Sequence, residues 1–155
     1  AISADGKIAQ TSDQLSLDWT SREDTRFFVE KTKEIGVMVM GRKTFETIGK
    51  ALPGRRMIVM SSKAGTVEGV EWTNESVVDL VARLESEGVQ GLTVCGGATV
   101  YSQFLQAGLV NELFLTIEPV LFGNGVPLAS GFDRINLKLV ESKLLGGGIL
   151  LHFTM

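Results

Sequence analysis

The sequence has very few of the residues on which several common kinds of protein site depend. Cys95 is the only cysteine and His152 the only histidine among 155 residues. A single cysteine excludes an internal disulfide and fits a reducing compartment, so we expect a cytoplasmic protein. One histidine and one cysteine cannot form a zinc site of the usual kind, and we expect no metal.

Long hydrophobic runs and a strong charge of either sign are also absent. No apolar stretch approaches the ~20 residues that a membrane helix needs, and no secretory signal is visible. The net charge of -3 gives the chain as a whole no electrostatic attraction to nucleic acid or to an anionic membrane. We therefore expect neither as a partner, while local basic clusters can still bind an anionic small molecule.

The remaining composition fits a single globular domain over residues 1–155. Hydrophobic residues make up 44% of the chain and charged residues 21%, as in soluble proteins with a sizeable core. No linker, repeat or low-complexity segment divides the chain. It begins with Ala1 rather than Met, inside an apolar stretch, so this interpretation leaves open a truncated first strand.

Short apolar runs alternate with helical patterns along most of the chain. The apolar runs predict buried strands at residues 37–40, 57–60, 92–95 and 113–117. The helical patterns lie between them, at residues 22–33, 76–87 and 99–107, and glycines that can end a helix follow each one, at Gly36, Gly88 and Gly108.

The C-terminal part has a different pattern. Apolar and polar residues alternate around Ile135, Leu137 and Leu139, and again from Ile149 to Phe153, with three glycines between the two runs. This predicts a hairpin with a glycine-rich connection. The fold class is therefore α/β: a single domain with a mostly parallel mixed sheet, flanked by helices and closed by a C-terminal antiparallel hairpin. Ligands of such sheets bind at the carboxyl ends of the strands.

Three predicted strand ends offer groups that bind anions. Gly96, Gly97 and Ala98 stand between a strand and a helix, where they form either a phosphate site or only a tight turn. The fingerprint G-x-G-x-x-G is absent, so a standard Rossmann site is not supported. The second strand end carries Arg42, Lys43 and Thr44, and the third carries Ser61, Ser62 and Lys63. Each strand end alone could be merely solvated. Together they predict a polyphosphate ligand with an extra phosphate, such as NADPH.

Asp24 is the clearest candidate for an ionised catalytic group. It lies in the first turn of a predicted helix, on the face that carries Phe27 and Phe28, where a carboxylate can enter a hydrophobic cleft. The alternative is a capping box with Ser21 as the N-cap, which the pattern favours, although one residue can serve both purposes. Arg55 follows a Pro-Gly turn and can bind a ligand carboxylate or simply be solvated.

Four blocks of sequence resemble dihydrofolate reductase, in the order and spacing of that family and over essentially the whole chain. They are WTSREDTRFFVEKT at residues 19–32, MGRKTFETIG at 40–49, LPGRRMIVMSS at 52–62 and VCGGATVYSQFL at 94–105. The resemblance implies a dihydrofolate reductase-like fold. It also implies NADPH-dependent reduction of 7,8-dihydrofolate to tetrahydrofolate, by hydride transfer to pterin C6 with protonation of N5.

The same resemblance implies roles for individual residues. In the catalytic group, Asp24 would anchor the pterin, Thr116 would brace that carboxylate, and Trp19 would order a water near the ring. Substrate contacts would come from Ala1, Phe28, Ile48, Leu52 and Arg55, with Arg55 on the glutamate α-carboxylate. Cofactor contacts would come from Ile8, Gly41, Arg42, Lys43, Thr44, Ser61, Ser62, Lys63, Cys95, Gly96, Gly97, Ala98, Thr99 and Val100.

Three further expectations follow from the resemblance. The peptide bond between Gly96 and Gly97 should be cis. Antifolates should bind to the substrate site. The protein should be a monomer, with a dimer left open.

The sequence departs from the family pattern in three places. The loop between Ile8 and Trp19 is a few residues longer than usual and has Asp18 in place of a proline, and Thr99 stands where a basic residue often occurs. Residues 118–128 (EPVLFGNGVPL) are more similar to the reductase domain of riboflavin biosynthesis. The alternative function is therefore reduction of a ribosylamino-pyrimidine phosphate. A non-enzymatic nucleotide-binding module ranks third, because it gives Asp24, Thr116 and Arg55 no joint purpose.

Overall fold

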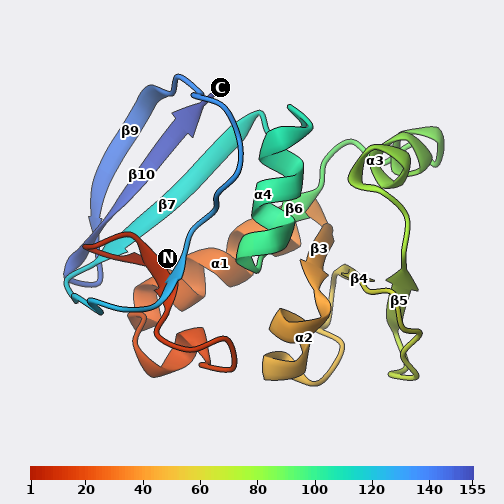
Figure 1. Ribbon diagram of the computed structural model, residues 1–155, viewed down its shortest axis with the longest axis horizontal. Helices are drawn as coiled ribbons and strands as arrows, with labels where there is room; N and C mark the ends of the chain where they lie inside the picture. The colour runs from red at the N-terminus through yellow and green to blue at the C-terminus, as the bar shows by residue number, and fades with distance from the viewer.

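The computed structural model describes residues 1–155 and places a parallel sheet at one end of the molecule (Figure 1). This sheet has the strand order β5-β4-β3-β6, and every neighbouring pair in it is parallel. Its strands are β3 (Val37–Gly41), β4 (Arg56–Met60), β5 (Val70–Thr73) and β6 (Thr93–Val94). Parallel pairing brings the carboxyl ends of β3, β4 and β6 to one edge of the sheet.

A second four-stranded sheet, with the order β1-β7-β10-β9, forms the other end of the molecule. The pair formed by β1 (Ile2–Ser3) and β7 (Glu112–Glu118) is parallel. Strand β10 (Gly148–Thr154) lies between β7 and β9 (Lys138–Leu145) and is antiparallel to both. A short antiparallel pair joins β2 (Lys7–Ala9) to β8 (Val126–Pro127).

Four α-helices and one 3-10 turn connect the strands. The helices are α1 (Arg22–Ile35), α2 (Arg42–Ile48), α3 (Val77–Ser86) and α4 (Ala98–Gln106), and the turn is η1 (Ser16–Asp18). Ser21 and Ser76 cap α1 and α3, because each hydroxyl accepts the N–H of the residue three positions later. Gly36 ends α1 with φ of 83°, in the left-handed region that favours glycine.

The buried core surrounds the parallel sheet on both faces. Val39 and Ile58 face one side, where they pack against Leu80 and Leu84 of α3 and Phe104 of α4. On the other face Met38, Met40, Met57 and Val59 pack against Phe45 of α2. With both faces covered, β3 and β4 are continuous apolar runs, which is why their positions were visible in the sequence.

The α/β fold class, the three long helices and the C-terminal hairpin are confirmed. Two details differ from expectation. The strands are hydrogen-bonded as two four-stranded sheets and one pair rather than as one sheet, and β9 begins at Lys138, so Ile135 and Leu137 precede it. The first strand of the hairpin is an exposed edge strand, and its apolar and polar residues give no buried face to mark its limits. None of the helices combines the length and the apolar character that a membrane span requires.

Candidate active site

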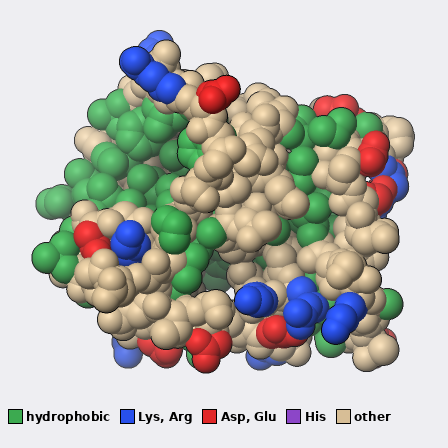
Figure 2. Space-filling view, viewed as in Figure 1, with side chains coloured by type: hydrophobic (Ala, Val, Ile, Leu, Met, Phe, Trp, Pro, Cys, Tyr) green, Lys and Arg blue, Asp and Glu red, His purple; other side chains and the backbone are tan.

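A cleft of about 1000 Å³ opens along the edge where β3, β4 and β6 end, and it is visible as a hollow between the two ends of the molecule (Figure 2). The first turn of α1 and the loop after β2 also line it. It gathers the predicted residues from segments far apart in the sequence. Thr116 and Lys63 do not line the cleft. The predicted residues that do are Ala1, Ile8, Trp19, Asp24, Phe28, Gly41, Arg42, Lys43, Thr44, Ile48, Leu52, Arg55, Ser61, Ser62, Cys95, Gly96, Gly97, Ala98, Thr99 and Val100.

Bare backbone from two strand ends forms one wall of the cleft. The N–H of Gly41 donates to the carbonyl oxygen of Gly96 over 2.8 Å, and the Gly96–Gly97 peptide is cis, as expected. A Cβ atom at Gly97 would lie 3.1 Å from Thr44 Oγ1, and one at Gly41 would lie 3.2 Å from a methyl group of Val100. These glycines therefore let α2 and the start of α4 pack closely on the two strand ends, where a side chain would press on Thr44 or Val100.

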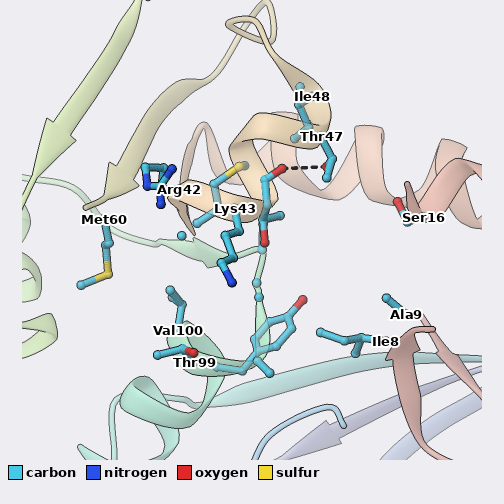
Figure 3. Close-up of a pocket in the computed structure, with 18 of the residues that line it drawn as sticks. Ile8, Ala9, Ser16, Arg42, Lys43, Thr47, Ile48, Met60, Thr99 and Val100 are labelled. Atoms are coloured by element: carbon cyan, nitrogen blue, oxygen red, sulfur yellow. Dashed lines mark hydrogen bonds between the residues drawn. The ribbon is translucent and has the colours of Figure 1, made fainter. Parts of the chain in front are cut away.

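The start of α4 opens onto this wall. Its N-cap residue, Gly97, has no side chain to accept the first free N–H groups of the helix, so these donors remain available to an anion. Figure 3 shows Lys43 extending from the start of α2 toward Thr99 and Val100. Arg42, next to it, pairs with Glu46 one turn along α2. Helix N–H groups, bare glycine backbone and two cations fit a dinucleotide diphosphate.

Asp24 combines the two roles that the sequence left open, but unequally. Its backbone N–H donates to Ser21 Oγ over 3.2 Å, so the helix cap is real. The return bond of a capping box, from the Ser21 N–H to the Asp24 carboxylate, is not made, because that N–H donates to Glu118 Oε1 over 2.8 Å. No hydrogen bond of the protein ends on the Asp24 carboxylate, which lines the cleft beside Phe28.

Arg55 lines the same cleft with part of its donor capacity unused. One guanidinium nitrogen, Nη1, donates to Thr32 Oγ1 over 2.9 Å. Its Nε atom is buried and has no protein partner. The guanidinium donors that Thr32 does not take can pair with the carboxylate of a ligand.

Comparison with known proteins agrees with this arrangement. The sequence profile described as "Dihydrofolate reductase" matches residues 1–119. The chain belongs to the dihydrofolate reductase family.

Two relatives show how similar this dihydrofolate reductase family member is to other proteins. The protein YyaP of Bacillus subtilis, whose activity is uncharacterised, is 25% identical over 97% of this chain and 88% of its own. The dihydrofolate reductase of Haemophilus influenzae is 34% identical over 64% of this chain and 59% of its own.

Solved structures show the same fold. The dihydrofolate reductase of Enterococcus faecalis, complexed with NADP(H) and the compound RAB-propyl, has a TM-score of 0.79 and 26% identity, covering 99% of this chain and 91% of its own. A protein named for riboflavin biosynthesis, from Shewanella sp. PV-4, has a TM-score of 0.85 at 23% identity, covering 99% and 94%. At that identity the second likeness shows the fold alone.

In this dihydrofolate reductase family member, Trp19 lines the cleft and packs against a residue far along the sequence. Its ring meets Phe122 edge to face, with 5.0 Å between ring centroids. Its Nε1 atom is buried without a protein partner, so it can donate to a water or a ligand. Asp5 fixes Phe122 in turn, because its carboxylate accepts the N–H groups of Phe122 and Gly123 over 3.0 and 2.8 Å.

Hydrogen bonds also set the charge state of Asp5. The hydroxyl of Ser3 donates to its carboxylate over 2.6 Å. That bond, followed by the Phe122 N–H, lowers the pKa of Asp5 to about 2. These bonds favour the ionised form of Asp5, and the same carboxylate holds the backbone of Phe122 and Gly123.

Sequence reasoning missed several residues of the cleft. Tyr101 is the clearest, since its ring lies 3.4 Å from the position of a Cβ on Gly96 and burial raises its pKa. Its place four residues after Gly97, on the cleft face of α4, was the available signal. Burial also raises the pKa of Cys95 to about 12, so this residue is a neutral thiol and not a nucleophile. Thr47, Glu75 and residues of the 12–17 loop are among the other residues that line the cleft.

Proposed function

We propose that this chain reduces 7,8-dihydrofolate to tetrahydrofolate with NADPH. One observation carries the proposal: the Asp24 carboxylate lines the cleft with no hydrogen bond from the protein, and Arg55, whose guanidinium has a single protein partner, lines the same cleft. An unpaired buried donor such as the Arg55 Nε is costly, and the half-buried Asp24 carboxylate has no protein donor, so a ligand with both a donor and an acceptor would satisfy the two groups. Dihydrofolate carries a donor-rich pterin edge at one end and a carboxylate at the other.

The pterin would bind against the first turn of α1. Its N3–H and 2-amino groups would donate to the two oxygens of Asp24, a charge-assisted pair. Phe28, Ile48 and Leu52 would supply apolar walls for the ring and the aminobenzoyl group, and Figure 3 shows Ile48 and Ile8 facing the cavity from opposite sides. Arg55 would take the α-carboxylate of the glutamate tail with the donors that Thr32 leaves free.

The cofactor site follows from the glycine wall. When bound, NADPH would supply the hydride for pterin C6. Gly96, Gly97 and Ala98 would hold its diphosphate against the start of α4, with Lys43 and Thr44 beside them. Arg42, Ser61 and Ser62 would hold the 2′-phosphate. Ser61 is already folded back on Lys63, with which it exchanges two hydrogen bonds, so we expect Arg42 to contribute more than Ser61.

The residues of the chain contribute to the reaction mainly by position and charge. Holding two rings in reacting geometry lowers a barrier by ~7–11 kcal/mol in favourable cases. Pterin N5 must gain a proton, and Asp24 would favour the protonated ring electrostatically while water carries the proton. The unpaired Nε1 of Trp19 would orient that water. Thr116 is buried and forms no hydrogen bond with Asp24 in the structure, so its bracing role stays a prediction.

The deciding experiment is NADPH oxidation with two substrates in parallel. We expect turnover with 7,8-dihydrofolate and none with a ribosylamino-pyrimidine phosphate. The second substrate is the alternative because residues 118–128 resemble the riboflavin-pathway reductases. Turnover of the pyrimidine alone would reject our proposal and support that alternative. Tight binding of methotrexate by equilibrium titration would support the folate-shaped site independently of turnover. We place the enzyme in the cytoplasm as a monomer.

A further inference from the structure

Glu118 is a buried carboxylate that the proposed reaction does not use. It is the last residue of β7 and is 3% exposed. Its Oε1 atom accepts two hydrogen bonds from one residue, the Ser21 N–H over 2.8 Å and the Ser21 hydroxyl over 2.9 Å. Ser21 precedes the first residue of α1, so Glu118 ties the start of that helix to the end of the strand, 97 positions away in the sequence.

The tie replaces one half of a capping box. In that motif the acidic residue at the third helical position accepts the N–H of the N-cap residue. Asp24 holds that position in α1, and α3 offers a direct comparison: there Asp79 turns back to its cap and its carboxylate accepts the Ser76 hydroxyl over 2.6 Å. In α1 Glu118 takes both donors of Ser21, and the Asp24 carboxylate is left to the cleft.

Ser21 has a second contact, with the glycine turn between β9 and β10. Gly146, in the turn between β9 and β10, has φ of 58°. A Cβ atom placed on it would come within 2.4 Å of both Cβ and Oγ of Ser21. The start of α1 is therefore enclosed between the end of β7 and the glycine turn, in a space with no room for adjustment.

We propose that Glu118 is a positioning residue for Asp24. By accepting both Ser21 donors it fixes the first turn of α1 on the second sheet and prevents the Asp24 carboxylate from closing the capping box, so that the carboxylate stays directed at the substrate. This inference rests on the proposed function, because Asp24 is the group whose placement it explains.

The test combines conservative and disruptive variants with a double-mutant cycle. Glu118→Gln keeps an acceptor oxygen, and single-turnover hydride transfer should stay within about threefold of the wild-type rate. Glu118→Met removes the acceptor in similar volume, and the rate should fall about 10- to 100-fold because a displacement near 1 Å is that costly to catalysis. NADPH affinity should not change in either variant. Glu118→Asp, which shortens the side chain but keeps its charge, should give an intermediate loss and serves if the Met variant does not fold.

Coupling to Asp24 separates positioning from a general effect on the fold. In an Asp24→Asn background, Glu118→Met should lower the rate by less than about threefold further. An equal loss in both backgrounds, or a wild-type rate in Glu118→Met, would overturn the inference.

Amide hydrogen exchange at Ser21 tests the tie without any substrate. Exchange should be slow in the wild type and in Glu118→Gln, and fast in Glu118→Met. If the wild type fails to reduce dihydrofolate, the proposed function is wrong, and the exchange rates still decide whether Glu118 holds α1. Equal exchange in all three proteins would reject the tie itself.

Discussion

The guanidinium of Arg55 is anchored by Thr32 on the neighbouring helix, through a 2.9 Å bond from Nη1 to the hydroxyl oxygen. That hydroxyl donates in turn to the carbonyl oxygen of Phe28 over 2.7 Å. Phe28 lines the cleft, so the residue proposed to read the substrate tail and the residue proposed to flank the ring belong to one hydrogen-bonded chain. A buried chain of this kind limits the positions available to both.

Arg55→Lys should selectively impair the use of substrates that carry the glutamate tail. Lysine keeps the charge but loses the planar fork, so we expect KM for dihydrofolate to rise about tenfold. KM for a small pterin without the tail should stay near the wild-type value. The measurement is steady-state NADPH oxidation with both substrates. Thr32→Val is the matched control, since it removes the anchor and leaves the guanidinium, and should give a smaller rise. Equal loss with both substrates would make Arg55 a structural residue.

Arg42→Ala should weaken the binding of NADPH far more than the binding of NADH. Hydrogen bonds to a charged group are worth about 1.5–3 kcal/mol, which corresponds to roughly 10- to 100-fold in Kd. The dissociation constants can be measured by fluorescence titration. Glu46→Gln is the informative partner, because it frees Arg42 from its ion pair and should tighten NADPH modestly. If Arg42→Ala weakens both cofactors alike, the 2′-phosphate lies elsewhere.

Asp24→Asn should lower hydride transfer at neutral pH by about 100-fold or more, because the amide cannot balance a protonated ring. The loss should shrink toward low pH, where solvent supplies the proton. The melting temperature should change little, since the Asp24 carboxylate takes no part in the cap.

Asp79→Asn is the matched control for Asp24→Asn. Asp79 holds the same position at the start of α3, outside the cleft, and its carboxylate does join the cap. That variant should lose stability within the ~0.5–2 kcal/mol range for caps and keep its rate. The assays are single-turnover NADPH oxidation across a pH series and a melting curve for each protein. A near-normal rate in Asp24→Asn would remove the main support for a folate substrate.

Asp5→Asn should destabilise the protein at neutral pH but not near pH 2. The folded-state pKa of Asp5, about 2, lies below its ordinary value of 3.8 because of the Ser3, Phe122 and Gly123 donors. A lowered pKa contributes stability above the ordinary value, and this contribution is lost as the pH falls through the folded value. The melting temperatures of wild type and Asp5→Asn should therefore differ at pH 6 and converge between about pH 4 and pH 2. If the difference in melting temperature were the same at every pH, the effect would come from the shape of the side chain rather than its charge. Asp133→Asn, at an exposed position, is the control.

Much of this cleft was accessible from local sequence, because the relevant signals are short in range. Buried strands of a parallel sheet are continuous apolar runs, and their ends point to one edge, so the residues after Met40, Met60 and Cys95 could be grouped without coordinates. Helix α2 was missed because its seven residues are too few for a periodic pattern. The start of β9 was misplaced because an exposed edge strand has no buried face to set its limits.

The contacts that set the site's fine geometry could not be predicted in this way. Glu118 and Ser21 are 97 positions apart, and nothing in either local segment indicates the other. The sequence reasoning therefore placed Asp24 as the acidic member of a capping box, when a distant carboxylate takes both donors of the cap. Phe122 against Trp19 is a second case, since a pair of aromatic rings from two loops leaves no periodic signal.

The position of β10 between β7 and β9 has a consequence for how the protein is made. Strand β10 ends at Thr154 and pairs with β7 over six residues of register, so the second sheet has no continuous centre until those residues are available to it. The turn that encloses Ser21 belongs to the same hairpin. Residues 37–97, which form the parallel sheet and the glycine wall of the cleft, therefore leave the ribosome before β10 does, and the second sheet can enclose the first turn of α1 only after residue 154 has been made. During translation the strand ends that line the cleft are therefore complete while the turn that packs on Ser21 is still missing, so the two sides of the cleft are assembled at different times.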